Sequence, residues 1–351
     1  MKTKHLILII TAAAALAACG GGGGSTTTPV APVIPVIPVT PMPTPLTANL
    51  VTSVPTPTYP AGSEELAAFN LLNAERTQCG FGKLAQNAQL DAAAKAHADY
   101  QLRNNVFSHF ESLAQFPSGF TGVDSQERVL AQGYSNSGAS SDLFSSVTST
   151  SSTVNLKTGI GESAMRRLLS APYHLNGLVD SYREVGIFVR ASSDVGVTGN
   201  RAILQINPAY KTAAGPQLMA ASDVLTYPCE GSTGVNRQLL GESPNPVPGR
   251  NLATQPLGTA ILVTVREGQT VRVTSSSVTK VSTGVPVVMR AAIDNTNDPA
   301  GPCTQGCFLS HQAYIIPDGA LDANSAYSVV VAGTNNGVGF TRSFRFVTGV
   351  N

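Results

Sequence analysis

The chain lacks tryptophan and is poor in charge. Its 351 residues include no tryptophan, and only 12% of them are charged. The 22 basic and 21 acidic residues nearly cancel, and no basic block with interleaved aromatic residues occurs. This composition argues against nucleic-acid binding. Beyond the N-terminal leader no apolar run is long enough to span a bilayer, so the sequence predicts no transmembrane helix.

Residues 1–19 have the pattern of an export signal. A basic start precedes the apolar stretch Leu6–Ala15, which is too short for a permanent membrane span. The segment ends in Leu16-Ala17-Ala18-Cys19, which resembles the bacterial lipobox. We therefore expect Cys19 to become a lipidated N-terminus that anchors the protein to a membrane, since stable anchoring needs more than one acyl chain. Gly20 in place of Asp implies the outer membrane in a Gram-negative host. An ordinary signal peptide with a chance cysteine is the alternative.

Residues 20–60 have too little apolar content to build a core. Glycines open the segment, and prolines recur at every third position from Pro29 to Pro41. Because polyproline II has three residues per turn, these prolines line one edge of an extended rod. The segment is predicted to be a tether that spaces the folded part from the lipid. A ligand for a proline-binding partner is the alternative.

Four cysteines remain after Cys19, an even number that favours two disulfides in an oxidising compartment. Three pairings are possible. We favour Cys303–Cys307 as a local clip and Cys79–Cys229 as a link between two domains. A zinc site is the competing interpretation, although a single C-x3-C is weak support for one.

Residues 61–215 are predicted to form an α+β layer domain. Apolar residues at helical spacing follow the capping residues Ser63 and Asn87, so a helix is expected after each of them. His97 lies on the alanine-rich face of the helix that follows Asn87 and is interpreted as a packing residue. Residues 135–158, rich in Ser and Thr, are predicted to be irregular. Further expected elements are helices at 125–132 and 162–169 and strands at 184–190 and 201–207.

Residues 222–350 are predicted to form an all-β, immunoglobulin-like sandwich. Short β-prone runs recur there between turns rich in Gly, Pro and Asn. His311 is interpreted as a surface or packing residue. The expected strands cover 260–265, 270–274, 285–292, 312–316, 327–331 and 340–347.

Two histidine motifs carry the functional information. They are Phe107-Ser108-His109 and Ala171-Pro172-Tyr173-His174, and each histidine lies where a helix is expected to end. Imidazole titrates near neutral pH and binds divalent metals. Two imidazoles that converge on one cleft would therefore indicate metal or acid–base chemistry.

Six motifs in this order resemble the CAP superfamily, which includes cysteine-rich secretory, antigen 5 and pathogenesis-related proteins. The resemblance covers roughly residues 63–207 and implies an α-β-α sandwich with a groove that holds two histidines and two acids, which bind zinc in some members. The Gly241–Pro246 segment and residues 321–333 resemble the β-sandwich that follows this domain in some bacterial members. The six motifs that resemble the CAP superfamily are Leu71–Arg76, Leu90–Tyr100, Phe107–His109, Glu127–Tyr134, Ala171–His174 and Glu184–Ile187.

When the site residues of the family are carried over by position, the resemblance implies that His109 and His174 are the groove histidines. Asp142 is the candidate for the first acid, although the family usually has a Glu in a Gly-Glu-Asn-like motif there. Glu162 is the candidate for the second acid. The side chain of Asp is one methylene shorter than that of Glu, so the Asp142 carboxylate would lie farther from a metal. This is expected to weaken a metal site, because ligand distances must hold within about 0.2 Å.

The sequence therefore predicts a lipid-anchored CAP-domain protein of the cell envelope. We expect the groove to bind a small or polymeric envelope ligand, with zinc or another divalent cation as the implied cofactor. One alternative is a hydrolase that uses metal-activated water on peptide, ester or cell-wall bonds; no GxSxG or HExxH motif supports it. The other alternative is an adhesive or structural envelope protein.

Overall fold

The computed structural model describes residues 46–301 and 307–351. The described part of its first half contains five α-helices and five strands, and that of its second half contains strands and no α-helix. The predicted class, an α+β domain followed by a β-rich region, is confirmed. The helices are α1 (Glu64–Gln78), α2 (Ala88–Asn104), α3 (Ser125–Ala131), α4 (Ile160–Ser170) and α5 (Pro172–Val179). The strands of this half are β1 (Ala85–Gln86), β2 (Ser137–Ser140), β3 (Leu143–Ser149), β4 (Glu184–Ala191) and β5 (Asn200–Lys211).

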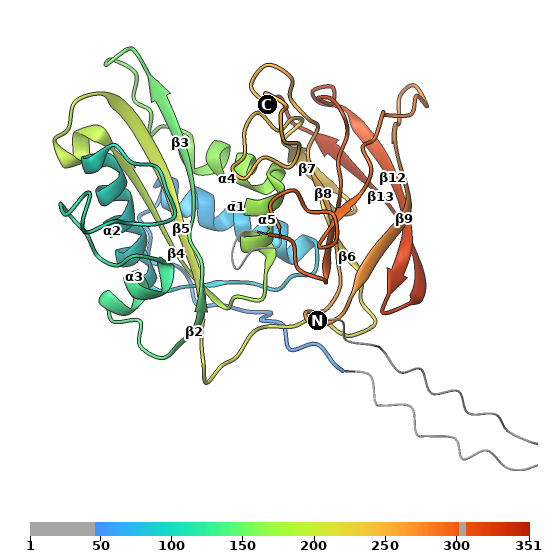
Figure 1. Ribbon diagram of the computed structural model, residues 1–351, viewed down its shortest axis with the longest axis horizontal. Helices are drawn as coiled ribbons and strands as arrows, with labels where there is room; N and C mark the ends of the chain where they lie inside the picture. Colours follow the sequence, from blue (N-terminus) through green and yellow to red (C-terminus); the bar gives the residue numbers. More distant parts are fainter. Residues whose placement is uncertain (1–45, 302–306) are drawn as a thin grey trace, which may run out of the picture. The chain divides into compact units, whose positions relative to one another are not determined.

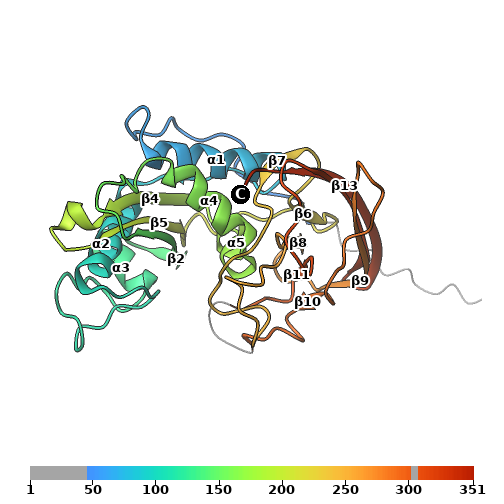
Figure 2. The same cartoon turned by 90° about the horizontal axis from the view of Figure 1, so that it is seen from above.

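The first half is a three-layer α-β-α sandwich. Its sheet has the order β1-β4-β5-β2, and β3 also pairs with β5. Helices α2 and α3 cover one face of the sheet, and α1, α4 and α5 cover the other (Figure 2). Gly186 in β4 permits the close approach of α2, because a Cβ at this position would collide with the backbone of Leu90 and Asp91.

The helix starts follow from their capping residues. The side chain of Ser63 accepts a hydrogen bond from the Leu66 N–H at 3.1 Å, and that of Asn87 accepts one from the Gln89 N–H at 2.9 Å. Each bond satisfies a backbone donor that has no partner inside its helix. The starts predicted for these two helices are confirmed.

The prediction that residues 135–158 are irregular is wrong in part. Strands β2 and β3 lie in this segment, and both pair antiparallel with β5. Its Ser and Thr residues were interpreted as loop residues, but the long β5 supplies backbone partners for them. Pairing with a neighbouring strand thus overrides a weak local preference.

The second half contains two four-stranded sheets, with the orders β10-β11-β8-β6 and β7-β13-β12-β9. The strand predicted at 285–292 is wrong, because the structure has only the isolated bridges of Pro286 and Met289 there. The immunoglobulin-like assignment stays a prediction. The strands are β6 (Leu225–Tyr227), β7 (Ser232–Val235), β8 (Ile261–Thr264), β9 (Val271–Lys280), β10 (Ile293–Asp294), β11 (Gln312–Ile315), β12 (Ala326–Asn335) and β13 (Val338–Thr348).

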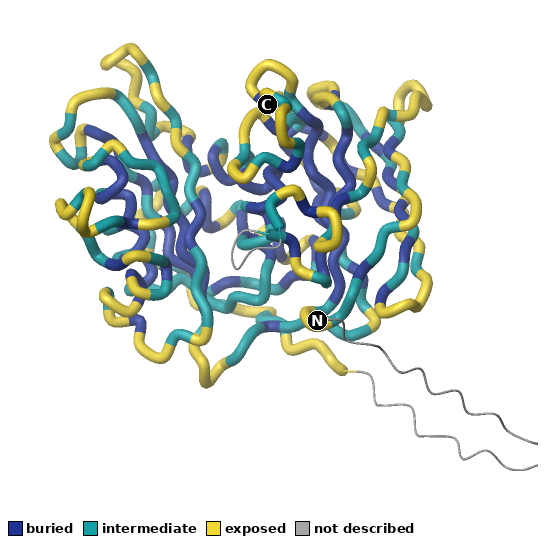
Figure 3. The backbone as a smooth tube through the Cα atoms, in the orientation of Figure 1, coloured by how far each residue is buried: buried dark blue, intermediate teal, exposed yellow. Residues whose placement is uncertain are grey.

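Strands β8 and β11 are buried on both faces. Ile261 and Val263 of β8 belong to the core cluster shared with β12 and β13, whereas Leu262 belongs to the cluster that also holds residues of α4 and α5. In β11, Ile315 and Tyr314 divide in the same way. Helices α4 and α5 therefore lie between the five-stranded sheet and the β-rich region (Figure 1), and buried backbone runs through both halves (Figure 3).

The two halves are also linked covalently. Cys79, at the end of α1, forms a disulfide with Cys229, which follows β6, as predicted. The other predicted pair includes Cys303, which lies outside the described residues. All described residues fall in one compact unit, so the boundary predicted between residues 215 and 222 stays a prediction.

The described end of the predicted tether is bound to the folded unit. The Asn49 N–H donates to the Leu218 carbonyl at 2.9 Å, and the Val51 N–H donates to Gln217 Oε1 at 3.0 Å. The Tyr59 hydroxyl donates to Asp91 Oδ1 at 2.6 Å. The tether predicted over 20–60 is therefore too long, because residues 46–60 follow the folded surface. Residues 1–45, with Cys19, lie outside the described residues.

Candidate functional site

The structure brings His109 and His174 together. Their ring centroids are 5.9 Å apart, although the residues come from the loop after α2 and from the first turn of α5. Pro172 starts α5, since a missing N–H has no cost at the first helical position. The helix start thus fixes where His174 projects. The CAP resemblance implied that these two histidines share a groove.

His109 is held by Asp142, which lies between β2 and β3. Its Nδ1–H donates to Asp142 Oδ2 at 3.0 Å, and Arg128 Nη2 forms an ion pair with Asp142 Oδ1 at 2.9 Å. Burial lowers the pKa of His109, but the hydrogen bond and charge of Asp142 outweigh it, so the pKa lies above its usual range. Burial raises the pKa of Asp142, but His109 and Arg128 hold it below its usual range. Asp142 is therefore ionised at neutral pH.

His174 is held by Glu242, which comes from the loop between β7 and β8. Glu242 Oε1 accepts from His174 Nδ1 at 2.9 Å and from the backbone N–H groups of Tyr173 and His174 at 3.0 and 3.2 Å. The Glu242 side chain is fully buried. Glu242 lies in a segment quoted above for its resemblance to the second domain, but nothing in the sequence indicated that it contacts His174, 68 residues away.

The placement predicted for Glu162 is wrong. Its side chain is 62% exposed and accepts a hydrogen bond from Arg166 Nε at 2.9 Å, on the same helix. Arg166 in turn donates to the carbonyl of Gly234 in β7 at 2.8 Å. Glu162 therefore supports a contact between the two halves and is not part of the groove.

His97 is a packing residue, as interpreted from the sequence. It is fully buried, with Nδ1 2.8 Å from Glu111 Oε1 and Nε2 3.0 Å from the Ser108 carbonyl. Because Ser108 precedes His109, these bonds fix the loop that carries the groove histidine. Arg128, fully buried, also donates to the His109 carbonyl at 3.0 Å.

The two histidines line a cavity of about 560 Å³, within the range of small-molecule sites. We call this cavity the groove. Both halves contribute to it, because it is lined by residues of α5, by residues 109–110 and 141–143, and by residues of the β-rich region. The remaining lining residues are Phe110, Ser141, Asp142, Leu143, Tyr173, Asn176, Gly177, Asp180, Tyr182, Ser243, Pro244, Cys307, Leu309 and Gln312.

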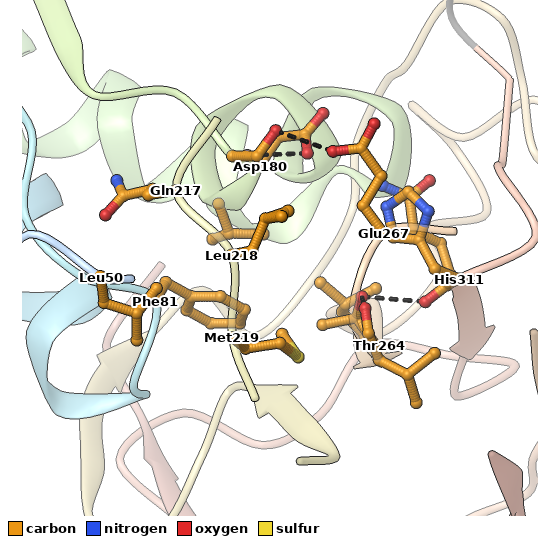
Figure 4. A pocket seen from close by; sticks show the side chains of 14 residues that line it. Leu50, Phe81, Asp180, Gln217, Leu218, Met219, Thr264, Glu267 and His311 are labelled. Atoms are coloured by element: carbon orange, nitrogen blue, oxygen red, sulfur yellow. Dashed lines mark hydrogen bonds between the residues drawn. The ribbon is translucent and has the colours of Figure 1, made fainter. Parts of the chain in front are cut away.

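A smaller cavity of about 40 Å³ adjoins the groove, since Asp180 and Gln312 line both. Figure 4 shows Glu267 beside His311 in this cavity, with Asp180 close by. Burial lowers the pKa of His311, although the charges of Asp180 and Glu267 oppose the effect. His311 is buried, which agrees with its interpretation as a packing residue.

The predicted metal set does not fit this geometry. Asp142 and Glu242 each accept from a histidine Nδ1, so their oxygens orient the imidazoles and are not directed at a shared ion. A metal in the groove would have two imidazole ligands, fewer than the three or four protein ligands usual for zinc. Among the described residues no group of three or more His, Cys, Asp or Glu side chains is arranged to hold a metal.

Comparison with known proteins identifies the first half. The model of the CAP, or cysteine-rich secretory protein, family matches residues 69–199, less than half of the chain. Residues 69–199 form a CAP domain. An outer surface protein from Borrelia burgdorferi matches at 14% identity and a TM-score of 0.32, over 42% of this chain and 93% of that chain. No curated protein matches the chain.

The CAP match contains His109, Asp142 and His174 but not Glu242. The second acid of this groove is thus supplied from outside the CAP domain. The Cys79–Cys229 disulfide also joins the CAP domain to the region that follows it, and disulfides persist in oxidising compartments. The chain thus contains a CAP domain at residues 69–199. Among the described helices, none has the length and apolar character needed to cross a membrane.

Proposed function

We propose that this protein binds a ligand of the cell envelope in the groove and does not transform it. One observation carries the proposal: two imidazoles, each fixed through Nδ1 by a buried carboxylate, line a cavity of about 560 Å³. Because Asp142 and Glu242 occupy both Nδ1 atoms, each ring presents Nε2 as its remaining polar atom. Polar groups held in place in this way orient a bound ligand and make the site specific for it.

Lipid attachment at Cys19 is the second part of the proposal. The leader with its terminal Leu16-Ala17-Ala18-Cys19 supports it. Residues 20–45 would then span the distance between the lipid and the folded unit, which places the groove in the envelope (the outer membrane in a Gram-negative host). Metabolic labelling with palmitate should mark the wild-type protein and leave Cys19→Ser unlabelled. Equal labelling of both would contradict the anchor.

Binding is tested with full-length protein and three probe classes: a neutral oligosaccharide, phosphatidylglycerol vesicles and a short peptide. At least one class should raise the melting temperature, and His174→Ala should weaken its binding at least about 10-fold, which corresponds to about 1.4 kcal/mol. Glu162→Ala is the matched control and should bind like the wild type, because its exposed carboxylate lies outside the groove.

The alternatives predict other outcomes of this experiment. A hydrolase would turn over the bound probe, and that turnover would stop in His109→Ala. An adhesive or structural protein would bind no probe in the groove, and neither histidine substitution would alter its behaviour. Either result would overturn the proposed binding function.

A further inference from the structure

The groove carries little positive charge. None of its lining residues in the described part of the chain is Lys or Arg, whereas two are acidic, Asp142 and Asp180. The charge of Asp142 is already matched by Arg128 and by the bond from His109. Anionic ligands are normally bound by Arg, by Lys or by free backbone N–H groups. The side chains of this groove do not supply such a site.

The N-terminus of α5 is also closed to an anion. A helix N-terminus attracts negative charge through its free N–H groups and its dipole. Here the N–H groups of Tyr173 and His174 both donate to Glu242 Oε1. The protein thus fills this position with its own carboxylate, which is fully buried. A phosphate or carboxylate group of a ligand would meet Glu242 there.

The groove is instead rich in uncharged polar groups. Gln312 Oε1 accepts the Leu309 N–H at 3.0 Å, which fixes the amide and directs Nε2 away from this bond. Asn176 is anchored in the same way by the hydroxyl of Tyr314. Ser141 and Ser243 line the same cavity. These amide and hydroxyl groups offer both donors and acceptors without a full charge, and the two histidines add their Nε2 atoms.

Two apolar side chains stand at the edge of the groove. Phe110 and Leu309 both line it, and each is 50% exposed. One comes from the CAP domain and the other from the β-rich region, so a ligand between them contacts both halves. Half-exposed apolar side chains beside fixed polar groups suit a ligand that has both apolar and hydroxyl-bearing faces.

We infer that the groove binds an uncharged, hydroxyl- and amide-bearing ligand of the oligosaccharide class, and that it selects against anions. This inference rests on the proposed binding function and names its ligand class. The hydroxyls of such a ligand would pair with Gln312, the serines and the histidines. Its ring C–H faces would lie against Phe110 and Leu309.

The test uses full-length protein in a polyoxyethylene detergent, which has no sugar headgroup. Calorimetry measures the affinity for tri-N-acetylchitotriose and maltotriose, and for a sulfated chondroitin tetrasaccharide and phosphatidylglycerol vesicles as anionic probes. We expect at least one neutral probe to bind and both anionic probes to fail. Because no ion pair forms, the affinity should change less than about two-fold between roughly 50 and 500 mM salt.

Variants then locate the binding. Phe110→Ala should weaken it at least about five-fold, since an apolar anchor is lost, and Ser243→Ala and Gln312→Ala should also weaken it. Leu113→Ala is the matched control: Leu113 lies in the same loop, is 58% exposed and does not line the groove. Phe110 is half exposed, so its replacement leaves the core intact.

Each outcome has a defined meaning. Neutral binding that Phe110→Ala weakens and Leu113→Ala does not supports the inference. Binding of an anionic probe alone, lost in His174→Ala, overturns the ligand class but leaves the proposed binding function standing. Failure of both classes overturns the inference, and failure of the peptide probe as well overturns the proposed binding function. Neutral binding that none of the groove variants changes places the sugar elsewhere and overturns the inference.

Discussion

Replacement of Glu242 tests whether the β-rich region is a structural part of the histidine groove. The Glu242 carboxylate is fully buried and accepts three hydrogen bonds, from His174 Nδ1 and from the N–H groups of Tyr173 and His174. Hydrogen bonds to a charged group contribute about 1.5–3 kcal/mol each, and removal of one partner of a buried charged pair costs about 3–5 kcal/mol. Because the three bonds share one oxygen, we expect Glu242→Ala to cost about 3–5 kcal/mol and not their sum.

Glu242→Gln separates charge from shape. Its carbonyl oxygen can still accept from the two backbone N–H groups, so we expect a smaller loss of about 1–2 kcal/mol. Urea denaturation followed by far-UV circular dichroism measures both losses; the chain has no tryptophan to report by fluorescence. NMR of His174 should show Nδ1 protonated in the wild type and a mixture of tautomers in Glu242→Ala.

The control for Glu242 is Glu162→Ala. Glu162 was the acid predicted from the sequence, but it is exposed and pairs only with Arg166 in its own helix, so its loss should cost no more than about 0.5 kcal/mol. A cost for Glu242→Ala below about 1 kcal/mol, or equal to that of Glu162→Ala, would refute the reasoning. The α5 N-terminus would then be stable without its cap from the second half.

Three further predictions follow from other contacts. The pKa of His109 is raised above 6.5 in the folded protein, so the stability that this residue contributes is lost as the pH rises through that raised pKa. The pKa of Asp142 is lowered below 3.8, so the stability that Asp142 contributes is lost as the pH falls through that lowered pKa. The stability difference between wild type and Asp142→Asn should therefore be largest between about pH 4 and 6.5 in denaturation series, and a flat difference would contradict this pairing. Reduction of Cys79–Cys229, which are 150 residues apart, should cost about 2–5 kcal/mol, measured by denaturation with and without reductant; equal midpoints would contradict it. The fragment 61–215 should bind a hydrophobic dye and unfold without cooperativity, because it exposes the face of α4 and α5 that packs on β8; cooperative unfolding would refute this.

The sequence predicted those parts of the site that local structure positions. His109 follows a helix whose start is set by the Asn87 cap, and His174 follows Pro172, which cannot continue the preceding helix; the helix α5 that Pro172 begins was not predicted. Asp142 could be predicted from its place in the CAP resemblance. In each case the signal lies in the same or the preceding element of the chain, and so a single sequence is enough to find it.

The tertiary parts escaped prediction for a physical reason. Glu162 has the residue type that the groove requires and a suitable position in the sequence, but it lies on the part of α4 that faces Arg166 and β7. The irregular appearance of 137–149 concealed two strands, because their hydrogen-bond partners lie in β5, more than fifty residues later. Neither the direction of a side chain nor a distant backbone partner can be read from local composition.

Glu242 shows why the two halves must be considered together. The CAP match ends at residue 199, before Glu242. A site built from residues 69–199 alone would therefore leave His174 Nδ1 and two N–H groups of α5 without an acceptor. Unsatisfied buried donors cost about 1–3 kcal/mol each. The same carboxylate that removes this cost also closes the helix N-terminus to anionic ligands. Stability of the joined halves and the ligand preference of the groove therefore depend on one residue, and substitutions at position 242 should change both together.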